Sequence, residues 1–231
     1  MDVILMAVRW YLSYPLSSRQ VVRLLAERNI DVSHRTVLTW TQRFGPQVAV
    51  EIRRHRRPIG RRWYVDEVFL FRKGEKRYLY RAIDEHGQVV DVLVREQRDT
   101  ESAQAFFRLA IERSGVSPDM VVTDHHQPYI KAVAAVCPGA QHVRTGLHRA
   151  RGETTKCIER SHVAMRDRLR SSRGLKRTAT GQRFLEGFEG LQTLWRGHLR
   201  LDVMAPSAST HDQSRAVVAT LHILAGRLRK G

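Results

Sequence analysis

The sequence predicts an α/β protein in which an all-α helix-turn-helix domain precedes a mixed sheet with the element order βββαβαβα. Residues 3–44 carry apolar side chains at helical spacing, interrupted at two places by serines that can cap helices, Ser17-Ser18 and Ser33. Residues 63–94 contain three apolar runs with short turns between them, and strand and helix patterns alternate after residue 99. The expected domains are a helix-turn-helix domain at 1–50, a basic linker at 51–62, the sheet domain at 63–200 and a tail with a helix at 201–231.

The charge of the chain indicates a polyanionic partner. Its 231 residues include 40 Lys and Arg but 23 Asp and Glu, a net charge of +17 at pH 7. An acidic stretch, residues 63–140, separates two basic ones, 1–62 and 141–200. This pattern is the one expected when a polyanion is held from two sides with carboxylates gathered between. No apolar run approaches the about 18 residues of a membrane helix. Two cysteines are too few for a disulfide framework, so we expect a cytoplasmic protein.

The first 50 residues are expected to form three helices. The first covers residues 3–14 and stops before a proline. The second is capped at Ser17-Ser18 and ends near Asn29, and the third is capped by Ser33 and covers residues 34–44. Two helices joined by a turn of about four residues form a helix-turn-helix, and the third helix would read the DNA.

The third predicted helix is expected to have a buried face and a DNA-binding face. The buried side chains are Val37, Leu38 and Trp40. The outward side chains, which can meet bases or phosphates, are His34, Arg35, Thr36, Thr39 and Arg43. A three-helix bundle without a DNA role has the same pattern. The following stretch is too charged for a core and is either a solvated linker or a phosphate-contacting one; its candidate contacts are Arg53, Arg54, Arg56 and Arg57.

The sheet domain is predicted from eight successive patterns. Strands are expected at 63–71, 77–83, 88–94, 120–123 and 141–145. Helices are expected from the Asp99-Thr100 cap, at 128–136 and from about residue 155. Because only short turns separate the first three strands, they should form an antiparallel meander.

Three carboxylates stand out in this domain. Asp66 lies inside an apolar strand, where a lone charge is costly, and Asp124 ends another strand. Glu159 lies in the first turn of the basic helix that is expected from about residue 155. If the three converge, each pair about 4 Å apart repels by about 4 kcal/mol, which Mg²⁺ or Mn²⁺ can offset. A pair of such ions serves phosphodiester chemistry, although spacing alone does not single these residues out.

The residues of several motifs, taken in order, resemble a known family. The motifs are Trp63-Tyr64-Val65-Asp66-Glu67, Tyr78-Leu79-Tyr80-Arg81-Ala82-Ile83-Asp84, Val121-Val122-Thr123-Asp124 and Ile158-Glu159-Arg160-Ser161-His162. Together they resemble the DDE transposases of the insertion-sequence-six family of bacterial mobile elements. The likeness covers roughly residues 5–197 and departs from the family at His125-His126 and at Thr155-Lys156-Cys157.

The resemblance implies a ribonuclease H-like fold and a catalytic mechanism. Asp66, Asp124 and Glu159 would hold two Mg²⁺ ions, with Mn²⁺ as an alternative. Residues 1–50 would bind terminal inverted repeats. His162 and Arg166 would lie beside the scissile phosphate or the end DNA, and the alternative is that they belong to a solvated basic face of the helix. Water would cut the element ends, and the freed 3′-OH would attack target DNA.

The same resemblance implies an assembly and a location, and two alternatives remain open. A homodimer or a higher synaptic complex would work on the bacterial nucleoid in the cytoplasm. The chain could instead be a decayed transposase that only binds DNA, or a metal-dependent nuclease of the same fold. Tyr129 is either a packing residue or a ring near the DNA end.

Overall fold

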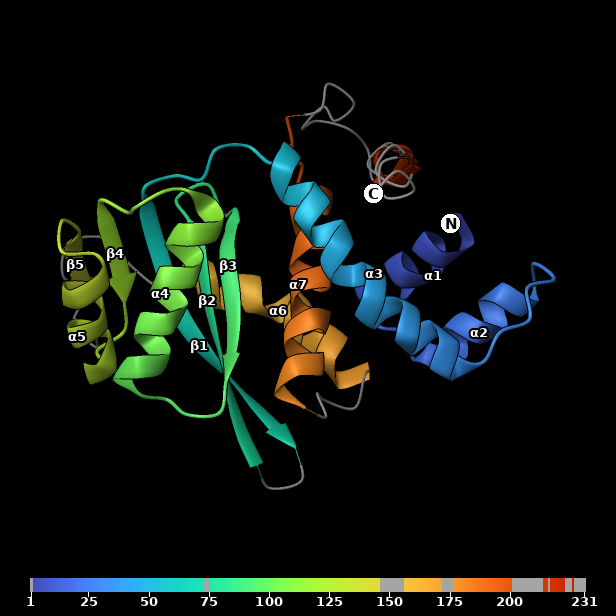
Figure 1. The fold of residues 1–231 in the computed structure, drawn as a ribbon, viewed down its shortest axis with the longest axis horizontal. Helices are drawn as coiled ribbons and strands as arrows, with labels where there is room; N and C mark the ends of the chain where they lie inside the picture. Colours follow the sequence, from blue (N-terminus) through green and yellow to red (C-terminus); the bar gives the residue numbers. More distant parts are fainter. Residues whose placement is uncertain are drawn as a thin grey trace. The chain divides into compact units, whose positions relative to one another are not determined.

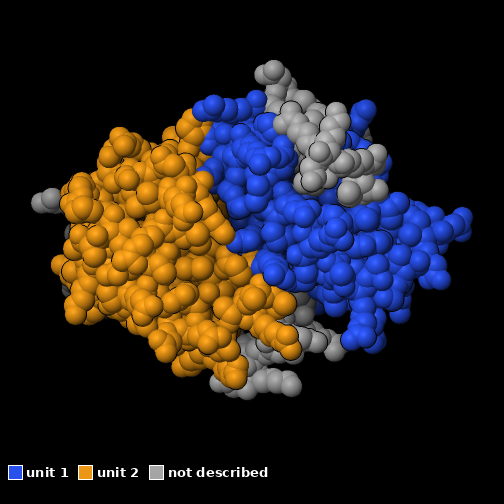
Figure 2. All heavy atoms as spheres, viewed as in Figure 1, with its two compact units in different colours: residues 1–57, 167–174, 183–231 blue, residues 58–166, 175–182 orange. Residues whose placement is uncertain are grey.

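The computed structural model describes residues 2–72, 75–145, 156–171, 177–200, 214–215, 217–222 and 226. The chain forms two compact units (Figure 2). The helical unit comprises residues 1–57, 167–174 and 183–231, and the sheet unit comprises residues 58–166 and 175–182. Among the described residues, no helix has the length and apolar character needed to cross a membrane. Of the predicted tail, residues 217–222 are helical and most others lie outside the described residues.

The helical unit begins with the three predicted helices, which are confirmed (Figure 1). They are α1 (Asp2–Ser13), α2 (Ser18–Ala26) and α3 (His34–His55). Both predicted caps form: Ser17 accepts from the backbone N–H of Gln20 in a capping box, and Ser33 accepts from that of Thr36. These caps fix where α2 and α3 begin.

Helix α3 is longer than predicted, and its predicted end at Phe44 is wrong. The helix passes through Pro46 and continues to His55. Gly45 precedes the proline and has no Cβ that would clash with the proline ring, so the backbone can stay helical at this point. The helix continues because Ile52, which is 1% exposed, keeps its apolar stripe buried. The expectation that this charged stretch stays out of the core is therefore also wrong, since Glu51 is buried beside Ile52.

The buried face of α3 differs from the prediction at one position. Leu38 is 37% exposed and Trp40 is half-buried, whereas Val37, Thr41 and Phe44 form the buried stripe. Successive helical residues are about 100° apart, so a stripe through Val37 and Thr41 turns Leu38 toward solvent. The prediction that Leu38 is buried is wrong for this reason.

Helix α7 (Thr178–Trp195) packs closely against α3 through glycines. A Cβ placed on Gly190 would lie 2.8 Å from the Cα of Ala49, and one on Gly187 would lie 3.0 Å from the Cα of Gly45. Both distances are too short for a side chain, so backbone meets backbone in this part of the helical unit.

The sheet unit contains a five-stranded mixed sheet (Figure 1). Its strands are β1 (Arg62–Arg72), β2 (Glu75–Asp84), β3 (Val89–Arg95), β4 (Met120–Thr123) and β5 (Gln141–Arg144). Their order across the sheet is β3-β2-β1-β4-β5. The first three strands form the predicted antiparallel meander, and β4 pairs in parallel with β1 and β5. With α4 (Thr100–Ser114), α5 (Gln127–Val136) and α6 (Lys156–Ser171), this confirms the order βββαβαβα and the ribonuclease H-like fold class.

The core of the sheet unit is aromatic. Trp63, Phe106 and Tyr129 are fully buried between the sheet and helices α4 and α5. The ring of Tyr129 packs edge-on against Tyr80 and Phe107, with centroids 6.3 and 6.2 Å away. Of the two interpretations of Tyr129, the packing role is the one that its burial supports.

The outer edge of β3 is occupied by a side chain. Gln182 donates from Nε2 to the carbonyl oxygen of Val92 at 3.0 Å, and its Oε1 accepts from the backbone N–H of Val94 at 2.8 Å. The amide therefore takes two adjacent bonding positions in the middle of the edge that a neighbouring strand would use. The start of α7 is thereby fixed to the edge of the sheet.

Candidate active site

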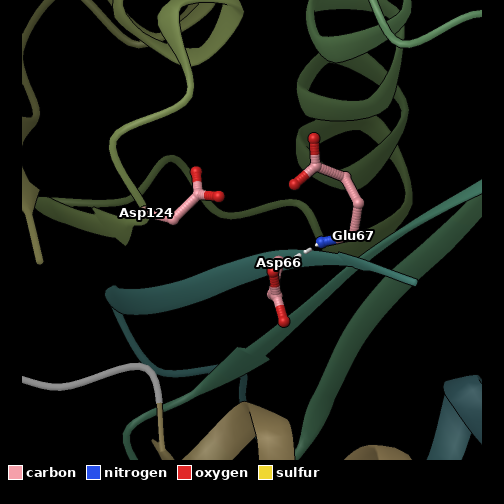
Figure 3. A group of neighbouring side chains, drawn as sticks. All are labelled: Asp66, Glu67 and Asp124. Carbon is pink, nitrogen blue, oxygen red and sulfur yellow. Dashed lines mark hydrogen bonds between the residues drawn. The ribbon is translucent and has the colours of Figure 1, made fainter. Parts of the chain in front are cut away.

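Three carboxylates gather where β1 and β4 lie side by side. Asp66 and Glu67 are consecutive in β1, and Asp124 directly follows β4. One carboxylate oxygen from each lies within 4.8 Å of the others. The parallel register pairs Tyr64 with Val122, so continuing it by two residues sets Asp66 beside Asp124. Figure 3 shows Glu67 and Asp124 on one side of the β1 ribbon and Asp66 on the other.

Backbone hydrogen bonds hold two of these carboxylates in place. Oδ1 of Asp66 accepts from the N–H of Glu67 at 2.8 Å, and Oδ1 of Asp124 accepts from the N–H of His126 at 2.9 Å. Each carboxylate thus has one oxygen fixed by the backbone. The second oxygen of each faces a side chain: Oδ2 of Asp66 lies 3.7 Å from Nδ1 of His162, and Oδ2 of Asp124 lies 3.5 Å from the guanidinium of Arg98.

The site concentrates negative charge. The pKa of Asp66 is raised to about 6, mainly by burial and in addition by the charges of Glu67, Asp124 and Glu159, while the hydrogen bond from the Glu67 N–H acts in the opposite direction. Ionised Asp66 is therefore destabilised by its surroundings. A cation placed among these oxygens would relieve that cost.

Glu159 lies near the cluster but is not part of it. It occupies the first turn of α6, and its side chain is exposed. Its charge acts on Asp66, yet it is not among the three carboxylates within 4.8 Å. The structure thus brings two of the three sequence-predicted acids into close contact and places the third in the vicinity.

His162 and Arg166, the other predicted residues of α6, have different surroundings. His162 is 0% exposed, with Nδ1 3.7 Å from Oδ2 of Asp66. Burial lowers its pKa to about 3, with Arg81 and Arg166 acting in the same direction, so the ring is neutral. Arg166 is exposed. Only Arg166 therefore presents its charge to solvent.

Two residues of the site did not emerge from the sequence. Glu67 is buried beside Asp66, and Arg98, in the connection before α4, donates from Nε to Glu67 Oε1 at 2.9 Å. The same guanidinium lies 3.5 Å from Oδ2 of Asp124. Glu67 could have been found from the sequence, because it is a second charged residue in the otherwise apolar β1 strand. Nothing local in the sequence marks Arg98.

The candidate DNA-binding residues lie mostly on the surface of the helical unit. The exposed ones are His34, Arg35, Thr39, Arg43, Arg54 and Arg57, and the half-buried ones are Thr36, Arg53 and Arg56. Thr36 also belongs to the α3 cap, where its hydroxyl lies 3.0 Å from that of Ser33. Arg43 packs its guanidinium 5.2 Å from the ring centre of Phe44. Exposed cations on α3 can meet a phosphate or a base edge.

Comparisons with known proteins agree on one family of enzymes. A family described as "DDE domain" matches residues 60–198. The chain is 32% identical over 199 residues to the transposase for insertion sequence-like element IS431mec of Staphylococcus aureus, covering 86% of this chain and 87% of that protein. The identity and coverage are the same for the Staphylococcus aureus transposase for insertion sequence element IS257 in transposon Tn4003.

Solved structures show more distant likenesses. The HTLV-2 integrase catalytic core domain in complex with magnesium is 17% identical, with a TM-score of 0.44 over 68% of this chain and 97% of that chain. A simian T-cell lymphotropic virus intasome in complex with PP2A regulatory subunit B56 gamma is 12% identical, with a TM-score of 0.45 over 85% of this chain and 73% of that chain.

Proposed function

The chain belongs to the DDE transposases of the insertion-sequence-six family, and on that basis we propose that Asp66, Asp124 and Glu159 hold the divalent cations of its reaction. The observation that carries this assignment is the cluster of carboxylates at β1 and β4, whose oxygens lie within 4.8 Å of one another. Oxygen-only ligands suit Mg²⁺ or Mn²⁺ rather than zinc. Glu159 would complete the set from the first turn of α6.

The electrostatics of the site fit such a cation. Burial and the neighbouring acids raise the pKa of Asp66, so the site accommodates its negative charges poorly on its own. When bound, a pair of Mg²⁺ ions, or Mn²⁺ in their place, activates the attacking oxygen and stabilises the leaving oxygen. Asp66 and Asp124 are held for this role by the backbone bonds of Glu67 and His126.

The reaction has two steps, both at phosphorus. Water attacks the phosphodiester at an element end and breaks its P–O3′ bond, which leaves a 3′-OH on the element and a 5′-phosphate on the flanking DNA. The 3′-OH then attacks a target phosphodiester, which joins the element to the 5′ side of the target break and releases a 3′-OH on the other side. Neutral His162 lies against Asp66 and limits where that carboxylate can move. Exposed Arg166, one helical turn further along α6, is placed to contact the phosphate backbone.

We assign end recognition to residues 1–50, with α3 as the reading helix. Double-stranded DNA, both element ends and target, is the expected partner of its exposed arginines and of the basic stretch at 51–62. Because two ends must be held together for joining, a homodimer or a higher synaptic complex is expected. The working location is the bacterial nucleoid.

The experiment that tests the proposal is a mobility assay in cells. The wild type and an Asp66→Asn/Asp124→Asn variant are expressed beside a plasmid carrying the native flanking ends, and new junctions are sequenced. New junctions with the wild type alone are expected. Cut ends without joined products would indicate a nuclease. Bound but uncut ends would indicate a DNA-binding protein that has lost its activity.

End recognition makes a separate prediction. Arg35→Ala and Arg43→Ala should each weaken binding to the element ends, by about 1–3 kcal/mol if the side chain reads a base. Binding is measured by titrating labelled end DNA at fixed salt. Arg108→Ala, which removes an exposed arginine from α4, is the matched control and should leave end binding unchanged. Unchanged affinity and specificity in both α3 variants would place recognition elsewhere.

A further inference from the structure

Arg98 is held on three sides at the edge of the carboxylate cluster. Its Nε donates to Glu67 at 2.9 Å, one terminal nitrogen lies 3.5 Å from Asp124, and its guanidinium lies 5.3 Å from the ring centre of Phe69. The next residue, Asp99, caps α4 by accepting from the N–H of Ser102. The backbone beside Arg98 is therefore fixed, and the side chain reaches the site from a rigid base.

The two ion pairs of Arg98 differ in their surroundings. The side chain of Glu67 is 1% exposed, whereas that of Asp124 is 41% exposed. A buried carboxylate that loses its cation is left with a large desolvation cost, but an exposed one regains water. The Glu67 pair should therefore persist, and the Asp124 pair should break easily.

The exposed pair occupies a position that a metal needs. Oδ1 of Asp124 already accepts from the N–H of His126, and Arg98 lies against Oδ2. A cation shared by Asp66 and Asp124 would bind the same outer oxygen. The guanidinium and the divalent cation therefore compete for Asp124.

We propose that Arg98 is a displaceable counter-ion of the active site, anchored by Glu67 and exchanged at Asp124 for a divalent cation. Without metal, Arg98 offsets the repulsion between the carboxylates. When a cation takes Asp124, the guanidinium stays paired with Glu67 and presents its free nitrogens to solvent, where a DNA phosphate can accept from them. Arg98 and Glu67 thus act as positioning residues, and this inference rests on the proposed function.

The proposed exchange predicts opposite effects on Mn²⁺ affinity for substitutions of Arg98 and of Glu67. Arg98→Gln removes the competitor, so Mn²⁺ should bind about tenfold more tightly, the size of effect that a charge about 4–6 Å away has on an ionisation equilibrium. Glu67→Gln removes a negative charge from the site. It also removes the partner that anchors Arg98, so the guanidinium pairs more strongly with Asp124 and Mn²⁺ should bind about tenfold more weakly. Arg98→Lys keeps the charge but loses the planar fork, so its Mn²⁺ affinity should lie closer to that of the wild type than the affinity of Arg98→Gln does. A general loss of structure would weaken binding in every variant.

The measurement is Mn²⁺ binding without DNA, followed by the electron paramagnetic resonance signal of free Mn²⁺, with circular dichroism to confirm folding. Arg95→Gln is the matched control, because Arg95 lies three residues earlier and contacts Ser102 and Glu101. Tighter binding in Arg98→Gln but not in Arg95→Gln would support the exchange. Equal or weaker binding in Arg98→Gln would overturn it and leave the metal site standing. A folded wild type that binds no Mn²⁺ would overturn both.

Discussion

Asp66→Asn is expected to abolish strand cleavage while leaving affinity for the element ends near that of the wild type. The amide has nearly the same shape as the carboxylate, so the β1 strand should be preserved, but it lacks the charge that holds a divalent cation. The loss should be at least about 100- to 1,000-fold, as when a single electrostatic group is removed from an active site. Purified protein, labelled end DNA and Mg²⁺ give the cleavage rate and the binding constant together.

The same variant should not be less stable than the wild type. The pKa of Asp66 is about 6 in the folded protein and about 3.9 in an unfolded chain, so the wild type gains stability as the pH falls through this window. At pH 7 the ionised side chain is a cost, which Asn removes. Thermal melting between pH 4 and pH 7 measures this difference.

Asp119→Asn is the matched control for both measurements. It makes the same chemical change at the opposite end of β4, where the side chain is 68% exposed and 3.6 Å from Arg61. Cleavage, binding and melting should all stay close to the wild type. An Asp66→Asn protein that loses end binding as fully as it loses cleavage would refute the metal-binding role of Asp66.

Phe106→Ala should cause the largest loss of stability of any change considered. Phe106 is 0% exposed. The centre of its ring lies 6.0 Å from that of Tyr80, on which it stacks, and 5.6 Å from that of Phe107. Removing a fully buried ring and leaving a cavity costs about 3–5 kcal/mol. Tyr80 is part of β2, so the loss of its partner ring should lower the opening free energy of β1 and β2 by about this amount. Their protected amides should then exchange faster. Native-state hydrogen exchange measures the opening free energy segment by segment.

Phe69→Ala supplies the comparison. The ring of Phe69 is 47% exposed on the same sheet and contacts Tyr78 and Arg98, so its removal leaves no enclosed cavity and should cost about 1 kcal/mol. The two variants lose the same atoms and differ in burial. If both lowered the opening free energy of β1 equally, the aromatic core described here would not be what stabilises the sheet.

The element order followed from the sequence because its signals are local. Ser17, Ser33 and Asp99 each cap the helix that they were expected to begin. The end of α3 was missed because Pro46 normally ends a helix, and only the burial of residues one and two turns later offsets that preference. Burial of that kind is a tertiary effect that no short window of sequence contains.

The site was partly predictable for a similar reason. Asp66 and Asp124 could be singled out because a charge inside an apolar strand and a charge at a strand end are both unusual. Glu159 was marked only by its place in the first turn of a basic helix, and the catalytic role of all three acids came from the resemblance to a family. Arg98 could not be found at all, because its two partners meet only when β1 and β4 lie side by side and the chain turns before α4.

The amide of Gln182 on β3 has a consequence for how copies of this chain can meet. An open strand edge invites a strand from another molecule, and such pairing leads to sheet extension and aggregation. On this edge the carbonyl of Val92 and the N–H of Val94 are already bonded to one side chain. The sheet is thereby protected against growing into a shared sheet at β3. In the proposed assembly of copies around two DNA ends, contacts between copies would therefore use surfaces other than this edge.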